Sequence, residues 1–306
     1  MRVLTVLFLS LLIAGCTSQE KKSQAETAPA ALKPIERPTA PAFMSNPQEV
    51  ASYLANHFWD KFDFRDTMYC HSKMTEQAFV DFLAVLPHST QDKAFQAVKK
   101  LMTEAEADIV MYNYFFRQAE HYLYEPNSPM RNDELFIPFL EQVVESPKIN
   151  ETLKIRPKHL LELAYRNRVG SKANNVVYTM VSGKTGNLYD ISAEFLILMF
   201  YNPGCKECQN TIETLKNSAS ITAAVSAGRL KILAVYPDKE LKEWYDKMKD
   251  VPATWINGYD KALAVREKEI YDLKAIPTLY LLDKNKTVLF KDTSTGVLND
   301  FFERNK

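Results

Sequence analysis

Glycine is absent from the long stretch between Cys16 and Val169, although the chain of 306 residues contains eight glycines. Gly15 stands alone before this stretch, and the other glycines lie at Gly170 or beyond it. A glycine inside a helix costs about 1 kcal/mol relative to alanine, so few glycines are expected in a helical region. The distribution therefore predicts two halves of different chemistry, the first of them rich in helices.

Helical patterns fill the glycine-free half, and we predict an all-α domain at residues 45–169. Asn46 supplies an N-cap, Pro47 follows at the first helical position, and Glu49 comes three residues after the cap, which is typical of a helix start. Later apolar residues recur at helical spacing and stop at prolines or polar breaks. The first expected helix begins at Asn46. The other five lie near residues 79–86, 90–105, 111–123, 133–144 and 158–167. Six helices with short connections indicate a compact bundle or array.

No function can be assigned to this half from its residues. Aromatic side chains at 112–124 could line a ligand groove, but at helical spacing they more often form core. The histidines are scattered singly, without an i, i+4 pair, so no metal site is expected. Cys70 and His71 are adjacent and would point about 100° apart on a helix, which disfavours a nucleophile–base pair. We expect Cys70 to be a buried free thiol, the alternative being a third redox cysteine.

A targeting segment precedes the folded part. Arg2 is followed by an apolar run at 3–14, which is shorter than the roughly 20 residues of a membrane-spanning helix but suits the core of a signal peptide. Ala14 and Gly15 stand before Cys16, in a pattern that resembles the bacterial lipoprotein box. We therefore predict a signal peptide at residues 1–15 and lipidation of Cys16, which would become the mature N-terminus. A plain secretory signal with a chance cysteine is the alternative.

Residues 16–44 are predicted to be a flexible linker that ties the folded part to the lipid anchor. They are rich in Ser, Gln, Glu, Lys, Ala and Pro and show no helical or strand period. The expected location is the cell envelope, facing the periplasm, where cysteine pairs form disulfides more often than zinc sites. The residue after Cys16 is Thr17 and not an aspartate, and this favours the outer over the inner membrane. With 38 basic and 38 acidic residues, the chain offers no general attraction to nucleic acid or to an anionic membrane surface.

Strand and helix patterns alternate in the second half, for which we predict an α/β domain at residues 170–306. The nearly unbroken apolar run at 194–201 fits a strand that is buried on both faces of a sheet. A hairpin is expected before this run, and an antiparallel pair of strands near the end. The other expected elements are strands at 230–236, 279–282 and 287–291 and helices at 209–217, 240–249, 262–271 and 298–304. This order indicates a three-layer α/β fold.

Two cysteines lie where the buried strand ends and a helix begins. At that point unpaired backbone N–H groups and the positive helix end stabilise a thiolate on Cys205. Lys206 would add to this effect, and Glu207 would partly oppose it. The spacing keeps Cys205 exposed and turns Cys208 inward, within reach of a disulfide. An attacking thiolate with a resolving thiol forms a two-electron exchange site.

Other uses of this cysteine pair are less favoured. A zinc site would want a second pair of ligands, and this half has no further cysteine and no histidine. A purely structural disulfide would close a very small loop and add little stability. No Ser/His/Asp set, phosphate-binding glycine loop or paired carboxylates were found. We therefore expect redox exchange that uses no metal and no cofactor.

Two motifs together resemble those of thioredoxin-like proteins, and among these the membrane-tethered TlpA/ResA-like periplasmic thiol-disulfide oxidoreductases. They are Phe-Tyr-Asn-Pro-Gly-Cys-Lys-Glu-Cys at 200–208 and Ala-Ile-Pro-Thr at 275–278, and the resemblance covers about residues 175–302. It implies that Cys205 is the nucleophile and Cys208 the resolving cysteine. It also implies that Pro277 is cis and faces the cysteines, and that Ile276 offers backbone hydrogen bonds to substrate. The implied partners are protein thiols or disulfides and a periplasmic or membrane electron donor.

The whole chain also looks like Bacteroidetes lipoproteins that place an uncharacterised helical domain before such a module. It departs from the thioredoxin pattern in two places. Pro203-Gly204 stands where a tryptophan usually precedes the first cysteine, and Met199 replaces the acid that thioredoxins bury. Asp238 or Glu240 could substitute for that acid, although acids after a strand are more often helix caps.

The leading hypothesis is a lipid-anchored, extracytoplasmic thiol-disulfide oxidoreductase. The alternative is a redox-inert thioredoxin-like scaffold or binding lipoprotein. A peroxidase-like thiol enzyme is disfavoured, because the Thr and Arg that surround the cysteine of such a site were not found.

Overall fold

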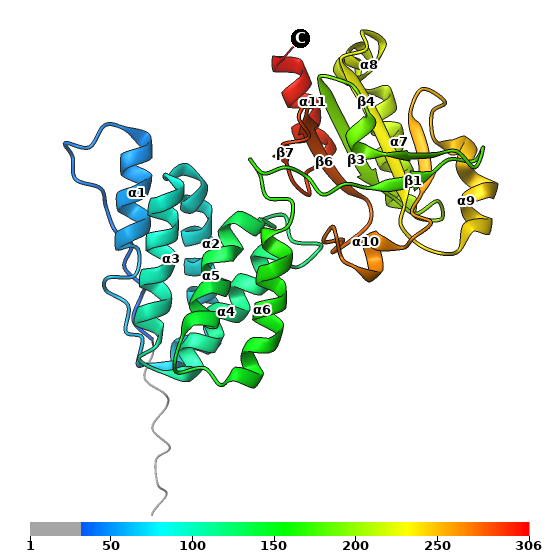
Figure 1. The fold of residues 1–306 in the computed structure, drawn as a ribbon. Helices are drawn as coiled ribbons and strands as arrows, with labels where there is room; N and C mark the ends of the chain where they lie inside the picture. Colours follow the sequence, from blue (N-terminus) through cyan, green and yellow to red (C-terminus); the bar gives the residue numbers. More distant parts are fainter. Residues whose placement is uncertain (1–31, 306) are drawn as a thin grey trace, which may run out of the picture. The chain divides into compact units, whose positions relative to one another are not determined.

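Six α-helices form the first part of the fold (Figure 1). A computed structural model describes residues 32–305. The helices are α1 (Pro47–His57), α2 (Lys73–Val85), α3 (Gln91–Ala105), α4 (Ile109–Leu123), α5 (Asp133–Glu145) and α6 (Glu151–Tyr165). Short 3-10 turns at Thr67–His71 and Leu86–His88 lie on either side of α2. The prediction of an all-α N-terminal region is confirmed.

Side-chain caps set the starts of these helices. The Oδ1 atom of Asn46 accepts hydrogen bonds from the backbone N–H groups of Gln48 at 2.9 Å and Glu49 at 3.3 Å, as the sequence predicted. Such caps satisfy donors that have no partner inside the helix. The other five helices are capped in the same way by Ser72, Thr90, Asp108, Asn132 and Asn150.

Aromatic side chains make much of the core of this part. Phe79, Phe82, Phe115, Phe136 and Phe139 are fully buried. Ring pairs such as Phe79 and Phe115, whose centroids lie 5.8 Å apart, join α2 to α4. Aromatic pairs at this distance contribute about 0.5–1.5 kcal/mol beyond the area they bury. The buried aromatics of α4 thus belong to the core, which is the more common of the two alternatives for the 112–124 stretch.

The last helix begins earlier than the sequence indicated. It starts at Glu151, capped by Asn150, whereas the prediction placed its start near Lys158. Pro157 lies inside it and would ordinarily end a helix, because proline lacks a backbone donor and clashes with the preceding turn. Here Pro157 is buried together with Leu160 and Leu163, and α6 packs on α5. Tertiary packing thus outweighs the local effect of the proline.

A seven-stranded sheet forms the second part, with strand order β2-β1-β5-β4-β3-β6-β7. Strand β3 pairs in parallel with β4 and antiparallel with β6, and it occupies the centre of the buried region. The strands are β1 (Val177–Thr179), β2 (Thr185–Asn187), β3 (Phe195–Phe200), β4 (Leu230–Tyr236), β5 (Ile256–Tyr259), β6 (Thr278–Asp283) and β7 (Val288–Phe290). The helices of this part are α7 (Lys206–Asn217), α8 (Ala219–Ser226), α9 (Leu241–Lys247), α10 (Ala264–Glu267) and α11 (Thr295–Arg304).

Both faces of this sheet are covered. Ile197 and Met199 of β3 pack into a cluster with buried residues of α7, α8, α9 and α11. Leu196, Leu198 and Phe200 point to the opposite face and pack with residues that include Val265 of α10. The apolar run at 194–201 is therefore buried on both faces, as predicted, and the α/β thioredoxin-like fold is confirmed.

Several elements differ from their predicted form. The sequence did not indicate α8 or β5. The segment expected to be a helix at 262–271 contains one turn, α10, because Leu263 and Glu269 adopt positive φ values of 52° and 49° on either side of it. Non-glycine residues rarely adopt this conformation, and it interrupts a helix. The second strand of the first hairpin begins at Thr185, and Leu188–Asp190 forms a 3-10 turn after it.

The end of the predicted linker contacts the helical part. The guanidinium of Arg37 lies 2.7 Å from a carboxylate oxygen of Asp81 and 4.9 Å from the ring centroid of Phe58. Glu36 pairs with Lys61. Residues from Pro34 onward belong to one compact unit, so the end of the predicted linker, from Pro34 to Met44, is part of the folded chain. The predicted signal peptide and Cys16 lie outside the described residues. Among the helices of residues 32–305, none is both long and apolar enough to cross a membrane.

Candidate functional site

Cys205 lies in the turn between β3 and α7. It is the N-cap residue of α7, and its Sγ accepts a hydrogen bond from the Cys208 backbone N–H at 3.3 Å. The turn is held by Asn202, whose side-chain oxygen accepts from the N–H of Gly204 at 2.9 Å and whose carbonyl accepts from the N–H of Cys205 at 3.1 Å. The side chain of Cys205 is half-buried. The sulfur therefore lies at the positive end of the helix.

Cys208 lies behind Cys205 and is fully buried. Its Sγ accepts a hydrogen bond from the backbone N–H of Asn202 at 3.4 Å. Burial raises the pKa of the Cys208 thiol well above its usual range, the neighbouring Cys205 and Glu207 raise it further, and the Asn202 N–H opposes them. Both cysteines are free thiols in this structure. The pair thus consists of a half-buried outer sulfur and a buried inner thiol that is difficult to ionise.

The Ile276–Pro277 peptide bond is cis, as the resemblance implies. The carbonyl oxygen of Ile276 lies 3.6 Å from the Sγ of Cys205, although the two residues are 71 positions apart. The sheet explains this proximity, because β3 and β6 are antiparallel and Phe200 at the end of β3 pairs with Thr278 at the start of β6. The structure therefore brings Cys205, Cys208 and the cis-proline segment 275–277 together.

No carboxylate takes the place of the missing buried acid. Met199 is fully buried in the same cluster as Cys208. Asp238 instead pairs with Arg266 at 2.9 Å, and Glu240 precedes α9 without capping it through its side chain. No described contact joins either carboxylate to Cys208. The inner thiol therefore packs among apolar side chains, and Glu207, the carboxylate that acts on it, raises its pKa.

The chain is similar to known protein families and solved structures. The family described as Domain of unknown function (DUF5106) matches residues 15–167, and the family described as Thioredoxin-like matches residues 193–288. A crystal structure of a thioredoxin-like protein from Bacteroides caccae is 43% identical, over 90% of this chain and 100% of that chain, with a TM-score of 0.87. The chain belongs to this thioredoxin-like family.

Further similar structures each cover a little under half of this chain. The C-terminal domain of an uncharacterized protein from Bacteroides fragilis is 49% identical over 45% of this chain and 98% of that chain, with a TM-score of 0.44. A domain of a possible thiol-disulfide isomerase from Cytophaga hutchinsonii is 26% identical over 46% of this chain and 95% of that chain, with a TM-score of 0.39. No curated protein matches the chain.

Within residues 32–305, the third cysteine of this thioredoxin-like chain lies in the helical part. Cys70 is half-buried, and its Sγ lies 3.6 Å from the Sδ of Met111. Burial raises the pKa of the Cys70 thiol, and the nearby carboxylates Asp108 and Asp66 raise it as well. No described contact joins Cys70 to Cys205 or Cys208. Cys70 is thus a free thiol, as expected, but it is half-buried where the prediction was a buried one.

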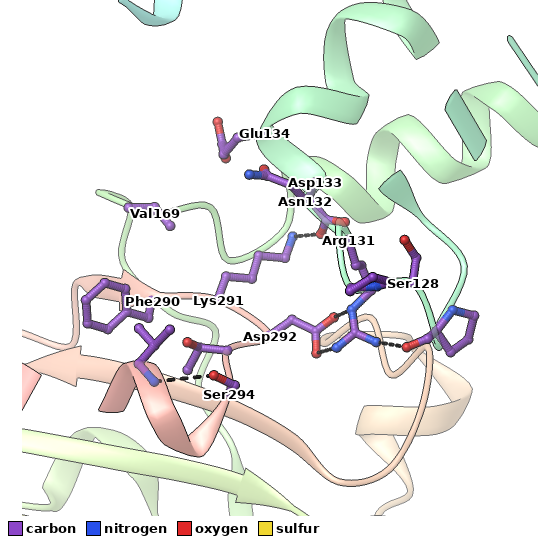
Figure 2. A pocket seen from close by; sticks show the side chains of 14 residues that line it. Ser128, Arg131, Asn132, Asp133, Glu134, Val169, Phe290, Lys291, Asp292 and Ser294 are labelled. Atoms are coloured by element: carbon purple, nitrogen blue, oxygen red, sulfur yellow. Dashed lines mark hydrogen bonds and ion pairs between the residues drawn. The ribbon is translucent and has the colours of Figure 1, made fainter. Parts of the chain in front are cut away.

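A cavity of about 590 Å³ lies between the helical and thioredoxin-like parts (Figure 2). Arg131, just before α5, pairs with Asp292, just after β7, at 2.8 Å beside this cavity. None of its lining residues belongs to the cysteine motif or to the cis-proline segment. The cavity is therefore separate from the candidate site.

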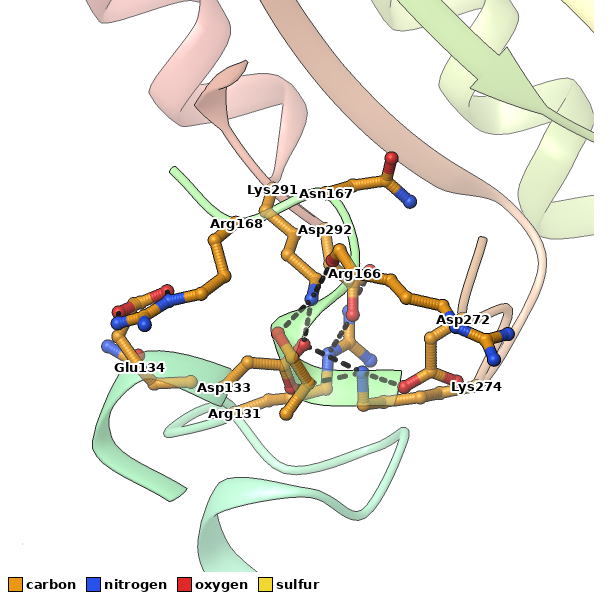
Figure 3. A network of polar contacts seen from close by, with 12 residues as sticks. Arg131, Asp133, Glu134, Arg166, Asn167, Arg168, Asp272, Lys274, Lys291 and Asp292 are labelled. Atoms are coloured by element: carbon orange, nitrogen blue, oxygen red, sulfur yellow. Dashed lines mark hydrogen bonds and ion pairs between the residues drawn. The ribbon is translucent and has the colours of Figure 1, made fainter. Parts of the chain in front are cut away.

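Charged residues between the two parts were missed by the sequence analysis. Asp133 of α5 lies close to Lys274 and Lys291, which belong to the thioredoxin-like part (Figure 3). The one available signal was the run Asp272-Leu273-Lys274 directly before the Ala-Ile-Pro-Thr motif, which places two charges beside an apolar segment.

Proposed function

We propose that this protein is an extracytoplasmic thiol-disulfide oxidoreductase that exchanges disulfides with partner proteins through Cys205 and Cys208. The observation that carries the proposal is the position of the Cys205 sulfur, which caps α7, lies 3.6 Å from the Ile276 carbonyl and stands in front of a buried second thiol. The fold and the membership of the thioredoxin-like family support it.

The first step is attack by the Cys205 thiolate on one sulfur of a substrate disulfide. The substrate S–S bond breaks as the mixed disulfide forms, and one substrate sulfur leaves as a thiolate that takes up a proton. Cys208 then loses its proton and attacks the Sγ of Cys205. This forms the Cys205–Cys208 disulfide and releases the second substrate sulfur. The substrate gains two electrons, and the protein is reset by a dithiol donor.

Electrostatics make the two steps unequal. Cys205 lies half-buried at the helix end, where its Sγ accepts a hydrogen bond from the Cys208 N–H. Burial raises the pKa of Cys208, so little of it is ionised near neutral pH. We therefore expect resolution of the mixed disulfide to be the slower step.

The cis-proline segment is suited to a polypeptide substrate. Ile276 precedes β6, so its backbone groups are outside the hydrogen-bond ladder between β3 and β6. An extended chain that approaches Cys205 can pair with such groups as an added strand does. Ile276 and Pro277 would thus bind substrate, and the two cysteines carry both electrons without a cofactor.

The proposal includes a lipid anchor at Cys16 that holds the protein in the cell envelope, facing the periplasm and on the outer rather than the inner membrane. Its support is the sequence of residues 1–17. We expect the full-length protein to sediment with membranes and a Cys16→Ala variant to lose that association. Membrane association that persists in this variant would contradict the anchor without affecting the redox proposal.

Trapping tests the exchange reaction. Cys208→Ser should accumulate mixed disulfides through Cys205 that dithiothreitol releases and that mass spectrometry can identify. The double variant Cys205→Ser/Cys208→Ser is the matched control and should trap nothing. The proposal fails if Cys208→Ser forms no adduct and the unmodified protein reduces no disulfide substrate.

The second candidate is a redox-inert scaffold. Met199 in place of a buried acid and Pro203-Gly204 before Cys205 favour it. In that case the cysteine pair would not exchange with external thiols. The trapping experiment would then give no adduct, and a measured reduction potential would separate this scaffold from an exchange protein.

A further inference from the structure

The segment that carries Ile276 and Pro277 is held by side chains from the end of the helical part. Residues 268–277 connect α10 to β6. Arg166, the C-cap residue of α6, donates hydrogen bonds to the carbonyls of Lys268 at 3.1 Å and Glu269 at 2.5 Å. The side-chain amide of Asn167 donates to the Ile270 carbonyl at 2.8 Å. These contacts fix the start of the segment.

A second contact fixes the segment directly beside the cis-proline (Figure 3). The Lys274 Nζ lies 3.0 Å from Asp133 Oδ1 and 2.7 Å from Asp272 Oδ2, and the Lys274 side chain is 1% exposed. It also lies 5.0 Å from the ring centroid of Tyr124 at the end of α4. Asp133, the first residue of α5, is also paired with Lys291 at 2.8 Å. The helical part thus supplies both a carboxylate and an aromatic face to Lys274.

The groups in this cluster are charged. Burial alone would raise the pKa of Asp133, but the positive charges of Lys274 and Lys291 have the larger effect and lower that pKa. Burial alone would lower the pKa of Lys274, but the negative charges of Asp133 and Asp272 have the larger effect and raise that pKa. A buried charge that leaves its partner carries a large desolvation penalty. Lys274 therefore has little freedom to move away from Asp133.

Lys274 is two residues from Ile276, whose carbonyl lies 3.6 Å from the Cys205 sulfur. A displacement of Lys274 would be transmitted through Ala275 to the backbone groups of Ile276. Cys205 itself is held by Asn202 and by its own helix, which do not depend on this cluster. Cys205 thus has contacts of its own besides the 3.6 Å approach of its Sγ to the Ile276 carbonyl.

We propose that the helical domain positions the cis-proline segment for substrate, with Asp133 acting through Lys274 and Arg166 acting on the start of the segment. This inference rests on the proposed function and assigns a role to the domain of unknown function. Asp133 is a positioning residue, since it touches neither the reacting sulfurs nor the substrate. Its loss should weaken the hydrogen bonds that Ile276 offers to a peptide and leave the chemistry of Cys205 intact.

The test uses full-length Asp133→Asn, with Glu134→Gln as the matched control. Glu134 is the next residue of α5 and also forms an ion pair, with Arg168 at 2.5 Å, but this pair lies within the helical part and no described contact joins Glu134 to residues 268–277. One hydrogen bond lost from the substrate complex corresponds to about a threefold to tenfold fall in kcat/KM. We expect that fall in Asp133→Asn for a protein disulfide, mainly through KM, and less than twofold in Glu134→Gln.

Alkylation of Cys205 by iodoacetamide separates positioning from general damage. Its rate should stay within twofold of the unmodified protein in Asp133→Asn, because the Asn202 carbonyl and the Cys208 N–H still hold Cys205. Positioning is overturned if exchange and alkylation fall together, or if exchange is unchanged. Should Asp133→Asn fail to fold, Arg166→Gln removes the other tie at a less buried position, and the same pattern is expected.

A readout independent of turnover keeps this inference separate from the proposed function. In protein labelled at isoleucine methyl groups, the Ile276 signal should shift in Asp133→Asn and stay unchanged in Glu134→Gln. An unchanged Ile276 signal in Asp133→Asn would overturn the positioning role. If the signal shifts but the unmodified protein exchanges no disulfides, the positioning holds and the proposed function fails.

Discussion

Replacing Lys274 by methionine is expected to destabilise the protein strongly. The Lys274 side chain is 1% exposed, and those of its partners Asp133 and Asp272 are each 7% exposed. Methionine has a similar volume, so the cavity left behind is small. Asp133 keeps Lys291, whereas Asp272 loses the cation beside it. Removing one partner of a buried ion pair costs about 3–5 kcal/mol, because the other charge stays buried without compensation.

Thermal or urea unfolding of the full chain measures this loss. A change of 1 kcal/mol moves Tm by about 2–4 °C in a protein of 150–250 residues, so a fall of about 6–20 °C is expected. Tryptophan fluorescence and circular dichroism should give coincident transitions before a free energy of unfolding is derived.

Lys216→Met is the control for this variant, since it removes a pair with Glu213 in which the side chains are 52% and 56% exposed. Exposed pairs contribute about 0–1 kcal/mol. A loss below about 1 kcal/mol in Lys274→Met, or one equal to that of the control, would refute the reasoning that buried charge compensation at Lys274 stabilises the fold.

The same variant has an expected pH dependence. Burial opposes ionisation of Asp133, but Lys274 and Lys291 hold its pKa below the ordinary 3.8. A lowered carboxyl pKa contributes stability that is fully present above the unfolded value and is lost as the pH falls through the folded pKa. Without Lys274 the pKa of Asp133 is lowered less, so the ionised Asp133 stabilises the variant less at neutral pH. The variant therefore loses less stability than the unmodified protein as the pH falls. The difference in free energy of unfolding should therefore be larger at pH 7 than at pH 3.

Two further predictions concern the resolving thiol. Because burial raises the pKa of Cys208, release of a thionitrobenzoate adduct from Cys205 should accelerate about tenfold per pH unit between pH 6 and 9. Stopped-flow absorbance measures this release, and a pH-independent rate would contradict the burial argument. Met199 shares the buried cluster of Cys208, so Met199→Asp should release the adduct faster at pH 7 than the uncharged Met199→Asn. Equal rates in the two variants would show that a carboxylate there does not assist Cys208.

Local patterns predicted much of the fold. The apolar run of β3 and the cap at Asn46 are signals contained within a few residues, and both appear in the structure as expected. The approach of Cys205 to Ile276 followed from the two motifs once they were assigned to a family. Its physical cause is the antiparallel register of β3 and β6, which the sequence alone does not show.

Tertiary packing decided the features that the sequence did not indicate. Pro157 reads as a helix break, yet α6 continues through it because that side is buried. Lys274 and Asp133 are 141 positions apart, and a pair of single charges at that distance leaves no periodic pattern. The residues that fasten the cis-proline segment to the helical part were therefore visible only in three dimensions.

A redox titration of Cys205 and Cys208 tests the central claim most directly. The protein is equilibrated with thiol and disulfide buffers of known potential, quenched with acid, and its free thiols are counted by alkylation and mass. We expect both cysteines to be oxidised together, with a potential in the range of about −120 to −270 mV that exchange proteins occupy, while Cys70 stays reduced. A potential below about −300 mV without exchange, or no disulfide between Cys205 and Cys208 at any potential, would contradict the account.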